Sequence, residues 1–135
     1  MKKSIDCFNK MCFSDFLVEN ISISEDIEIE LSFEHENRFI LKCENYIGIS
    51  IIGFWEDCII DKIILSNEGD LIDSSKEKII KNYYNHEVPF SDIKNIKDRW
   101  YQIDIILIDG CVIKIACNNV SVRKENERDF IFRLN

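Results

Sequence analysis

The amino-acid sequence predicts a mainly β (α+β) fold: a curved antiparallel β-meander, sandwich or partly open barrel of about eight strands, with one packed helix at about residues 74–85. Two observations predict this class. Apolar and polar residues alternate with a period of two along several segments, as they do in strands that have one buried face. One proline and four glycines indicate short connections, which suit antiparallel neighbours and exclude the long crossovers of a parallel sheet.

A single domain spanning residues 1–135 is expected from length and composition. The chain is long enough to bury one core, and its 46% apolar and 31% charged residues are typical of a globular protein. No apolar stretch reaches the length of a membrane-spanning helix, and none follows Met1 in the manner of a secretory signal. We therefore expect a cytoplasmic protein, and the abundance of isoleucine, asparagine and lysine indicates a bacterial source.

The first strand pair is predicted by alternation over residues 21–33, where the odd positions are mostly apolar and the even positions are polar. A second alternating run begins at Phe39 after a short polar gap. Pairing Phe33 with Phe39 through a three-residue loop keeps the apolar residues on one face and sets Glu30 opposite Lys42. The sequence therefore predicts a hairpin with this register.

The second hairpin surrounds an Asp-Gly pair. A two-residue loop would mix apolar and polar side chains on both faces of the strands. A three-residue loop over 108–110, with a left-handed glycine, separates them better. It pairs Leu107 with Cys111 and Tyr101 with Cys117, so we expect this register.

Further strands are expected over residues 47–54 and 59–65, which are apolar at both odd and even positions and therefore suit the centre of a sheet. Near the end of the chain, residues 119–123 and 129–134 alternate around the charged turn 124–128. These segments complete the expected count of about eight strands.

The helix is predicted by its start signal. Ser74 and Glu77 have the spacing of a capping box, in which a hydroxyl and a carboxylate satisfy free amides of the first turn. Apolar residues follow at helical spacing, and the helix is expected to end before Pro89. A shorter helix over about residues 5–13 is also expected.

The six cysteines are expected to be free thiols, because none lies in a Cys-x-x-Cys motif and the protein is expected in a reducing compartment. Cys43, Cys111 and Cys117 fall on inward strand positions, where a thiol acts as a small apolar side chain. Neither a metal site nor a cofactor is predicted. The alternative is a metal site that combines His86 with the remaining cysteines, which are Cys7, Cys12 and Cys58.

The charge is acidic and uneven. The formal net charge is −8, and residues 1–70 hold 6 basic and 15 acidic side chains. Such a domain repels phosphate backbones, so nucleic-acid binding is not expected. A basic protein partner would be attracted, chiefly through faster association.

Two groups of residues are candidates for binding a partner. The first is an acidic strand face, whose carboxylates are Glu28, Glu30, Glu34 and Glu36. The second is an edge at the end of the predicted helix, where aromatic residues combine apolar area with polar tips. Its members are Tyr83, Tyr84, His86 and Phe90. No residue is predicted to be catalytic.

The stretch Gly-Phe-Trp-Glu-Asp-Cys-Ile-Ile-Asp-Lys-Ile over residues 53–63 belongs to a small, acidic chain with a β pattern and no secretory signal. In size, charge and general pattern the chain resembles the small immunity or uncharacterised proteins of bacterial toxin loci. This resemblance implies neutralisation of a toxin by binding. It rests on no specific motif, so it carries no residue's role over to this chain.

The sequence favours a non-enzymatic protein-binding domain, in the form of an immunity-like protein that neutralises a basic toxin or another partner. The alternative is a small-ligand-binding barrel or sandwich with an apolar pocket lined by Trp55, Trp100 and Tyr101. A third hypothesis is a thiol- or metal-dependent enzyme centred on His86 and a cysteine. The short motifs of phosphate-binding, hydrolytic and calcium-binding sites do not occur.

Overall fold

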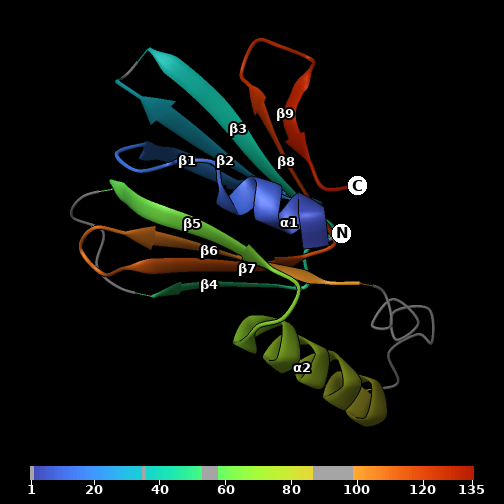
Figure 1. Cartoon of the computed structure of the whole chain (residues 1–135). Helices are drawn as coiled ribbons and strands as arrows, with labels where there is room; N and C mark the ends of the chain where they lie inside the picture. The colour runs from blue at the N-terminus through green and yellow to red at the C-terminus, as the bar shows by residue number, and fades with distance from the viewer. Residues whose placement is uncertain (1, 35, 53–57, 87–98) are drawn as a thin grey trace.

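The computed structural model describes residues 2–34, 36–52, 58–86 and 99–135. In these residues the fold is mainly β, with nine strands in two antiparallel sheets and two helices, and the sheets do not close into a barrel (Figure 1). The predicted fold class is therefore confirmed, with one strand more than the expected eight.

The two sheets are called sheet A and sheet B. Sheet A has the order β1-β2-β3-β8-β9 and consists of β1 Leu17–Ile23, β2 Ile27–Phe33, β3 Asn37–Glu44, β8 Asn119–Lys124 and β9 Phe130–Arg133. Sheet B has the order β4-β7-β6-β5 and consists of β4 Gly48–Ile52, β5 Ile60–Ser66, β6 Tyr101–Leu107 and β7 Val112–Cys117. The helices are α1 Lys2–Asn9 and α2 Asp70–His86.

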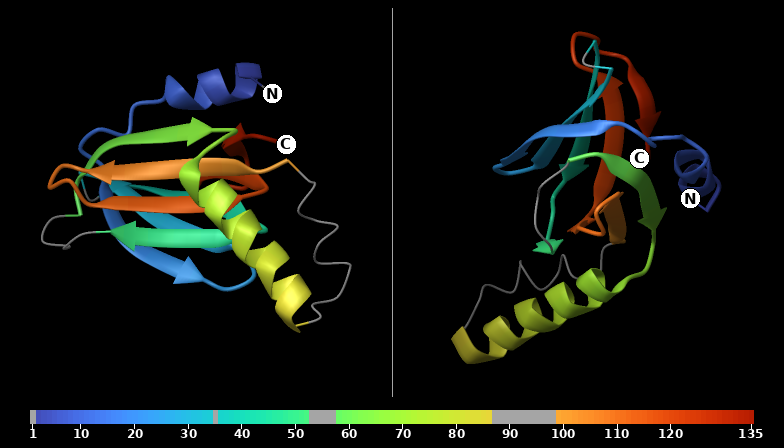
Figure 2. Two further views of the ribbon diagram at one scale, coloured as in Figure 1. Left: turned by 90° about the horizontal axis from the view of Figure 1, so that it is seen from below. Right: turned by 90° about the vertical axis from the view of Figure 1, so that its left-hand side faces the viewer.

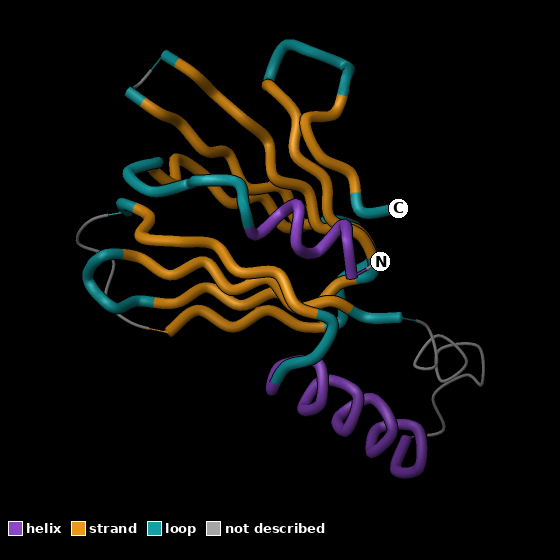
Figure 3. Tube along the Cα trace, viewed as in Figure 1, coloured by secondary structure: helices purple, strands orange, loops and turns teal. Residues whose placement is uncertain are grey.

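The sheets join at one corner, where the chain passes from β3 to β4 and from β7 to β8. The amide of Asn118 donates to the carbonyl of Glu44 at 3.0 Å, and the amide of Ile47 donates to the carbonyl of Ala116 at 2.8 Å. Asn45 turns the chain with a φ of 52°, a conformation that asparagine tolerates. From this corner the two sheets spread apart (Figure 3).

The main core lies between the sheets and is built from the inward residues of both. Helix α1 closes one side of it: Phe8 is fully buried and its ring lies 5.1 Å from that of Phe132. The side-chain amide of Asn9 exchanges two hydrogen bonds with the backbone of Leu65, at 2.8 and 2.9 Å. This side chain continues the hydrogen bonding of β5 and ties α1 to sheet B.

The β6–β7 hairpin has the predicted register. Tyr101 lies opposite Cys117, and the Leu107 amide donates to the Cys111 carbonyl at 2.9 Å. Gly110 has a φ of 91°. The three-residue loop over 108–110 is therefore confirmed.

The predicted β2–β3 register is wrong by two residues. Phe33 lies opposite Asn37 rather than Phe39, and the turn is made with Glu34 in the left-handed conformation, at a φ of 55°. A shift of two residues leaves every side chain on its expected face, which is why alternation did not reveal it. Arg38 now forms an ion pair with Glu30 at 2.8 Å, diagonally across the strands.

Residues 21–33 are also two strands rather than one. A tight turn at Ser24–Asp26, closed by a hydrogen bond from the Ser24 amide to the Asp26 carbonyl at 3.0 Å, separates β1 from β2. Alternation resumes beyond the turn in the same phase, so the sequence pattern is continuous across it.

The segments expected at the centre of a sheet, 47–54 and 59–65, form its two edges instead. Residues 53 and 54 lie outside the described residues. Both the odd and the even positions of these strands are apolar because some of their isoleucines are exposed. Ile52 is 60% exposed and Ile64 is 39% exposed. The expected strands at 119–123 and 129–134 are present as β8 and β9.

Both helices begin earlier than predicted. Helix α1 starts at Lys2, and α2 starts at Asp70, four residues before Ser74. The Ser74 hydroxyl donates to the carbonyl of Leu71 at 3.3 Å, so Ser74 lies within the helix and does not cap it. The start of α2 is capped by a side chain from sheet B.

Candidate functional site at the start of helix α2

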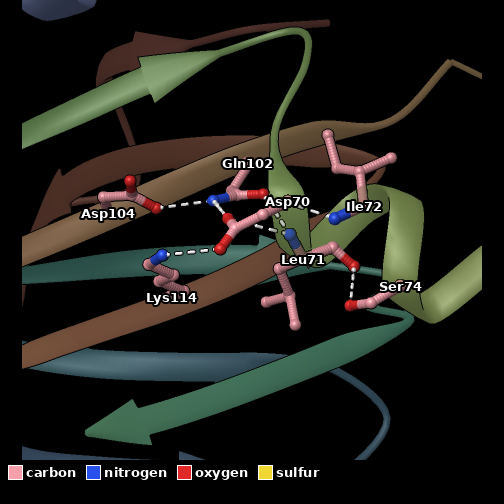
Figure 4. A network of polar contacts seen from close by, with 7 residues as sticks. All are labelled: Asp70, Leu71, Ile72, Ser74, Gln102, Asp104 and Lys114. Carbon is pink, nitrogen blue, oxygen red and sulfur yellow. Dashed lines mark hydrogen bonds and ion pairs between the residues drawn. The ribbon is translucent and has the colours of Figure 1, made fainter.

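The start of α2 is held on the outer face of sheet B, the face turned away from sheet A, by Gln102 of β6. Gln102 is only 4% exposed. Its Oε1 accepts hydrogen bonds from the amides of Leu71 at 2.9 Å and Ile72 at 3.3 Å, which belong to the first turn of the helix (Figure 4). The Leu71 amide also donates to Asp70 Oδ1 at 3.0 Å. A Cβ at Gly69 would overlap the Gln102 amide, so this close approach requires glycine.

The other end of the Gln102 amide organises two carboxylates. Nε2 donates to Asp70 Oδ1 and to Asp104 Oδ1, each at 2.9 Å, and Lys114 Nζ lies 2.9 Å from Asp70 Oδ2 (Figure 4). The hydrogen bond from Lys114, followed by that from Gln102, lowers the pKa of Asp70 to about 2. In return, Asp70 raises the pKa of Lys114. This network fixes the ionised Asp70 and the first turn of α2 in place.

An open hollow of about 610 Å³, here called the acidic hollow, lies beside this network. It is lined by residues of β5, β6 and the start of α2, which are Ile64, Ser66, Glu68, Gly69, Asp70, Asp73, Gln102 and Asp104. Four of these residues are carboxylates. Lys114 pairs with Asp70, and no described cation forms an ion pair with Glu68, Asp73 or Asp104. The hollow therefore carries more negative than positive charge on a concave surface, and Lys114, which lies opposite Asp104 in the pairing register, is the cation beside it.

The acidic strand face predicted from the sequence lies partly on the outer face of sheet A. Glu28 and Glu30 belong to β2, whereas Glu34 and Glu36 lie at the exposed turn that follows it. Basic residues of β3 share the face: Lys42 lies opposite Glu28 in the register, and Arg38 pairs with Glu30 at 2.8 Å. The structure thus places the four glutamates along one strand and its turn, but on a face of mixed charge.

Three members of the second predicted group lie at the opposite end of α2 from the acidic hollow. Tyr83, Tyr84 and His86 belong to the last turns of the helix. Phe90 lies outside the described residues. A role for this group in binding a partner stays a prediction.

The cysteines at inward strand positions are buried, as predicted: Cys43, Cys111 and Cys117 belong to the main core. Hydrogen bonding to Cys117, together with burial, raises the pKa of the Cys43 thiol well above its usual value. A thiol held in this protonated form is a poor nucleophile. Cys7 and Cys12 are exposed, and Cys58 is half-buried. Within the described residues, no group of three or more His, Cys, Asp or Glu side chains is placed to hold a metal ion.

The aromatic residues expected to line a ligand pocket do not lie together. Tyr101 is buried in the main core between the sheets, whereas Trp100 packs with Ile72 and Ala116 under α2, on the other face of sheet B. Trp55 lies outside the described residues.

Sequence reasoning missed the acidic hollow. The capping-box pattern places the helix start at Ser74, so Glu68, Asp70 and Asp73 fall before the expected helix. Their distance in sequence from Asp104, more than thirty residues, hid the shared surface. The one local signal was the density of acidic residues around Gly69 just before an apolar helical stripe, which is typical of a helix start.

Comparison with protein-family models, with curated proteins and with solved structures finds no significant match for this chain. None of the described helices is long and apolar enough to cross a membrane.

Proposed function

We propose that this chain is a non-enzymatic protein-binding domain whose acidic hollow receives a basic segment of its partner. The observation that carries the proposal is the grouping of Glu68, Asp73 and Asp104 around one concave surface without an ion-pair partner among the described residues. A lysine or arginine side chain that enters the hollow would form ion pairs with these carboxylates.

The framework beneath the hollow supports this function. Gln102 and Lys114 hold Asp70 and the first turn of α2 against sheet B through hydrogen bonds of 2.9 Å. Because Gln102 holds the carboxylates of Asp70 and Asp104, a partner's cation meets two preplaced carboxylates, and less ordering entropy is lost on binding. Arginine is favoured as the entering group because its planar guanidinium engages carboxylates through two parallel hydrogen bonds.

The charge of the whole chain supports a basic partner as well. A net charge of −8 accelerates association with a cationic protein at moderate ionic strength. An immunity-like role, in which the domain neutralises a basic toxin by binding it in the cytoplasm, is consistent with this charge and with the free thiols.

The proposal is tested with an arginine-rich peptide as the probe, by fluorescence anisotropy at low and at physiological salt. The triple variant Glu68→Gln, Asp73→Asn, Asp104→Asn removes three charges from the hollow while preserving side-chain shape. We expect it to weaken binding about tenfold or more, since each exposed ion pair contributes roughly 0.5 kcal/mol. The salt dependence should fall as well.

The matched control is Glu125→Gln, Glu127→Gln, Asp129→Asn, which removes three exposed carboxylates beyond β8. It should retain most of the wild-type affinity at physiological salt, because only the net charge has changed. Equal losses of affinity in the two variants would mean that peptide binding depends on net charge alone, and the proposal would then be rejected.

A further inference from the structure

The edge strands of the two sheets differ in how they are protected. Among the described strands, β1, β5 and β9 each carry at least one charged residue, and each has an irregularity in its pairing register. Charges and bulges at an edge discourage the addition of another strand. Strand β4, with the sequence Gly-Ile-Ser-Ile-Ile, has neither.

Strand β4 is also apolar and exposed. It pairs with β7 along one side, and no described strand pairs with its other side. Ile51 is 48% exposed and Ile52 is 60% exposed. A regular, uncharged edge with exposed isoleucines is a template for pairing with a further strand.

Helix α2 extends beyond this edge. It contacts β6, β7 and β4, and Figure 2 shows that it then continues past β4. A Cβ at Gly48 would overlap the Ser75 side chain, which marks where the helix crosses the edge. The helix has 17 residues and is about 26 Å long, whereas three adjacent strands span only about 10 Å between the first and the third. Its second half, which includes the 40% exposed Ile80, therefore lies beyond β4.

An apolar row on the outer face of sheet B lies outside the cluster that α2 covers. In the pairing register, Ile52 of β4 lies opposite Val112 of β7, which lies opposite Ile106 of β6. Helix α2 covers a different row, in which Gly48 lies opposite Ala116. The two rows are parallel and are separated by the length of β4.

We propose that β4 is the dimer interface of this protein, where a second copy of the chain adds its own β4 in antiparallel orientation about a two-fold axis at Ser50. This register sets Ile49 opposite Ile51 of the second copy, and Gly48 opposite Ile52 of the second copy. It joins the two four-stranded sheets edge to edge into one continuous sheet.

A second copy fits this edge better than an unrelated strand because of where it places the apolar row. In this register Gly48 lies opposite Ile52 of the second copy. The row under α2 in one copy therefore continues across the interface into the apolar row of the second copy, which consists of Ile52, Val112 and Ile106. The second half of α2 then covers that row, and the two-fold axis repeats the contact. One arrangement thus accounts for the uncharged edge, the overhanging helix and the apolar row, and it is independent of the acidic hollow.

The oligomeric state tests the proposal. By sedimentation equilibrium, the wild-type protein should have twice the 16.0 kDa mass of the chain at micromolar concentration. Ile51→Lys places a charge in the paired edge and should raise the dimer dissociation constant more than about 100-fold. The control Ile131→Lys makes the same change at a 47% exposed position of β9 and should leave the dimer intact. A monomeric wild type, or a dimer that resists Ile51→Lys, would overturn the proposal.

A second measurement covers the case in which Ile51→Lys does not fold. Ser50→Cys, with the exposed Cys7 and Cys12 changed to serine, places one thiol on the proposed axis. Oxidised glutathione should convert it to a disulfide-linked dimer, with two thiols oxidised and two glutathione thiols released. Ser22→Cys on β1, in the same background, should give glutathione adducts of the single chain without a disulfide between chains. Equal dimer yields from the two variants would contradict the proposed axis.

Discussion

The outer faces of the two sheets differ in how their carboxylates are paired with basic residues. On sheet A, Arg38 and Lys42 of β3 lie among the acidic side chains, and ion pairs such as Arg38 with Glu30 at 2.8 Å form across the strands. On sheet B, Lys114 pairs with Asp70, and the remaining carboxylates of the acidic hollow have no ion pair with a described residue. The position of the counter-ions, more than the number of acidic residues, distinguishes a face with paired charge from one suited to bind a cation.

The two faces also differ in what their polar residues stabilise. The buried Ser32 of sheet A donates one hydrogen bond to Glu19, whereas the buried Gln102 of sheet B serves two helix amides and two carboxylates. Gln102 therefore connects the start of a helix with two carboxylates of the candidate site. The buried Asn119 of sheet A also serves two amides and one carboxylate, but these groups lie at the ends of strands.

The largest expected effect is that of Gln102→Ala. It removes the cap of α2 and leaves buried polar groups without partners, so it should lower the free energy of unfolding by about 2 to 4 kcal/mol. Ser32→Ala, which removes one hydrogen bond from sheet A, should cost about 1 kcal/mol. Urea unfolding followed by circular dichroism measures both. Equal losses would show that the Gln102 network is no more important than a single hydrogen bond.

A smaller effect is expected when the counter-ion of the acidic hollow is removed. In Lys114→Met, the pKa of Asp70 should rise from about 2 toward its ordinary value of 3.8. Because the folded-state pKa is lowered, the stabilising contribution of Asp70 is present above pH 3.8 and is lost as the pH falls through about 2. Wild type and variant should therefore differ most in stability above about pH 4 and converge near pH 2.

The titration of Asp70 by NMR checks this prediction directly. Arg38→Met, which removes a cation from sheet A, is the matched control and should leave the Asp70 titration unchanged. An Asp70 pKa that stays near 2 without Lys114 would contradict the assigned cause of the shift.

The hairpins show how much of this fold the sequence can predict. For β6–β7, the competing loops differ by one residue, so they place different side chains on the core face, and burial selects between them. For β2–β3, the competing registers differ by two residues and bury the same side chains. The choice then depends on the turn conformation at Glu34 and on diagonal ion pairs, which residue patterns do not resolve.

The edge strands and the helix start were predicted wrongly for a different reason. An apolar run such as Ile51-Ile52 has the same pattern whether it is covered by neighbouring strands or exposed at the edge of a sheet. The cap of α2 comes from Gln102, 31 residues away from Leu71, so local spacing pointed to Ser74 instead. The acidic hollow depends on that long-range contact, and it therefore could not be assembled from the sequence.

The central claim is that a cationic segment binds at the acidic hollow rather than on the face of sheet A. A titration of the ¹⁵N-labelled protein with an arginine-rich peptide tests it most directly, because amide shifts report where the peptide binds. The largest shift changes are expected at residues 66–73 and 102–104. Largest changes along β2 and β3, or changes spread evenly over the surface, would contradict it.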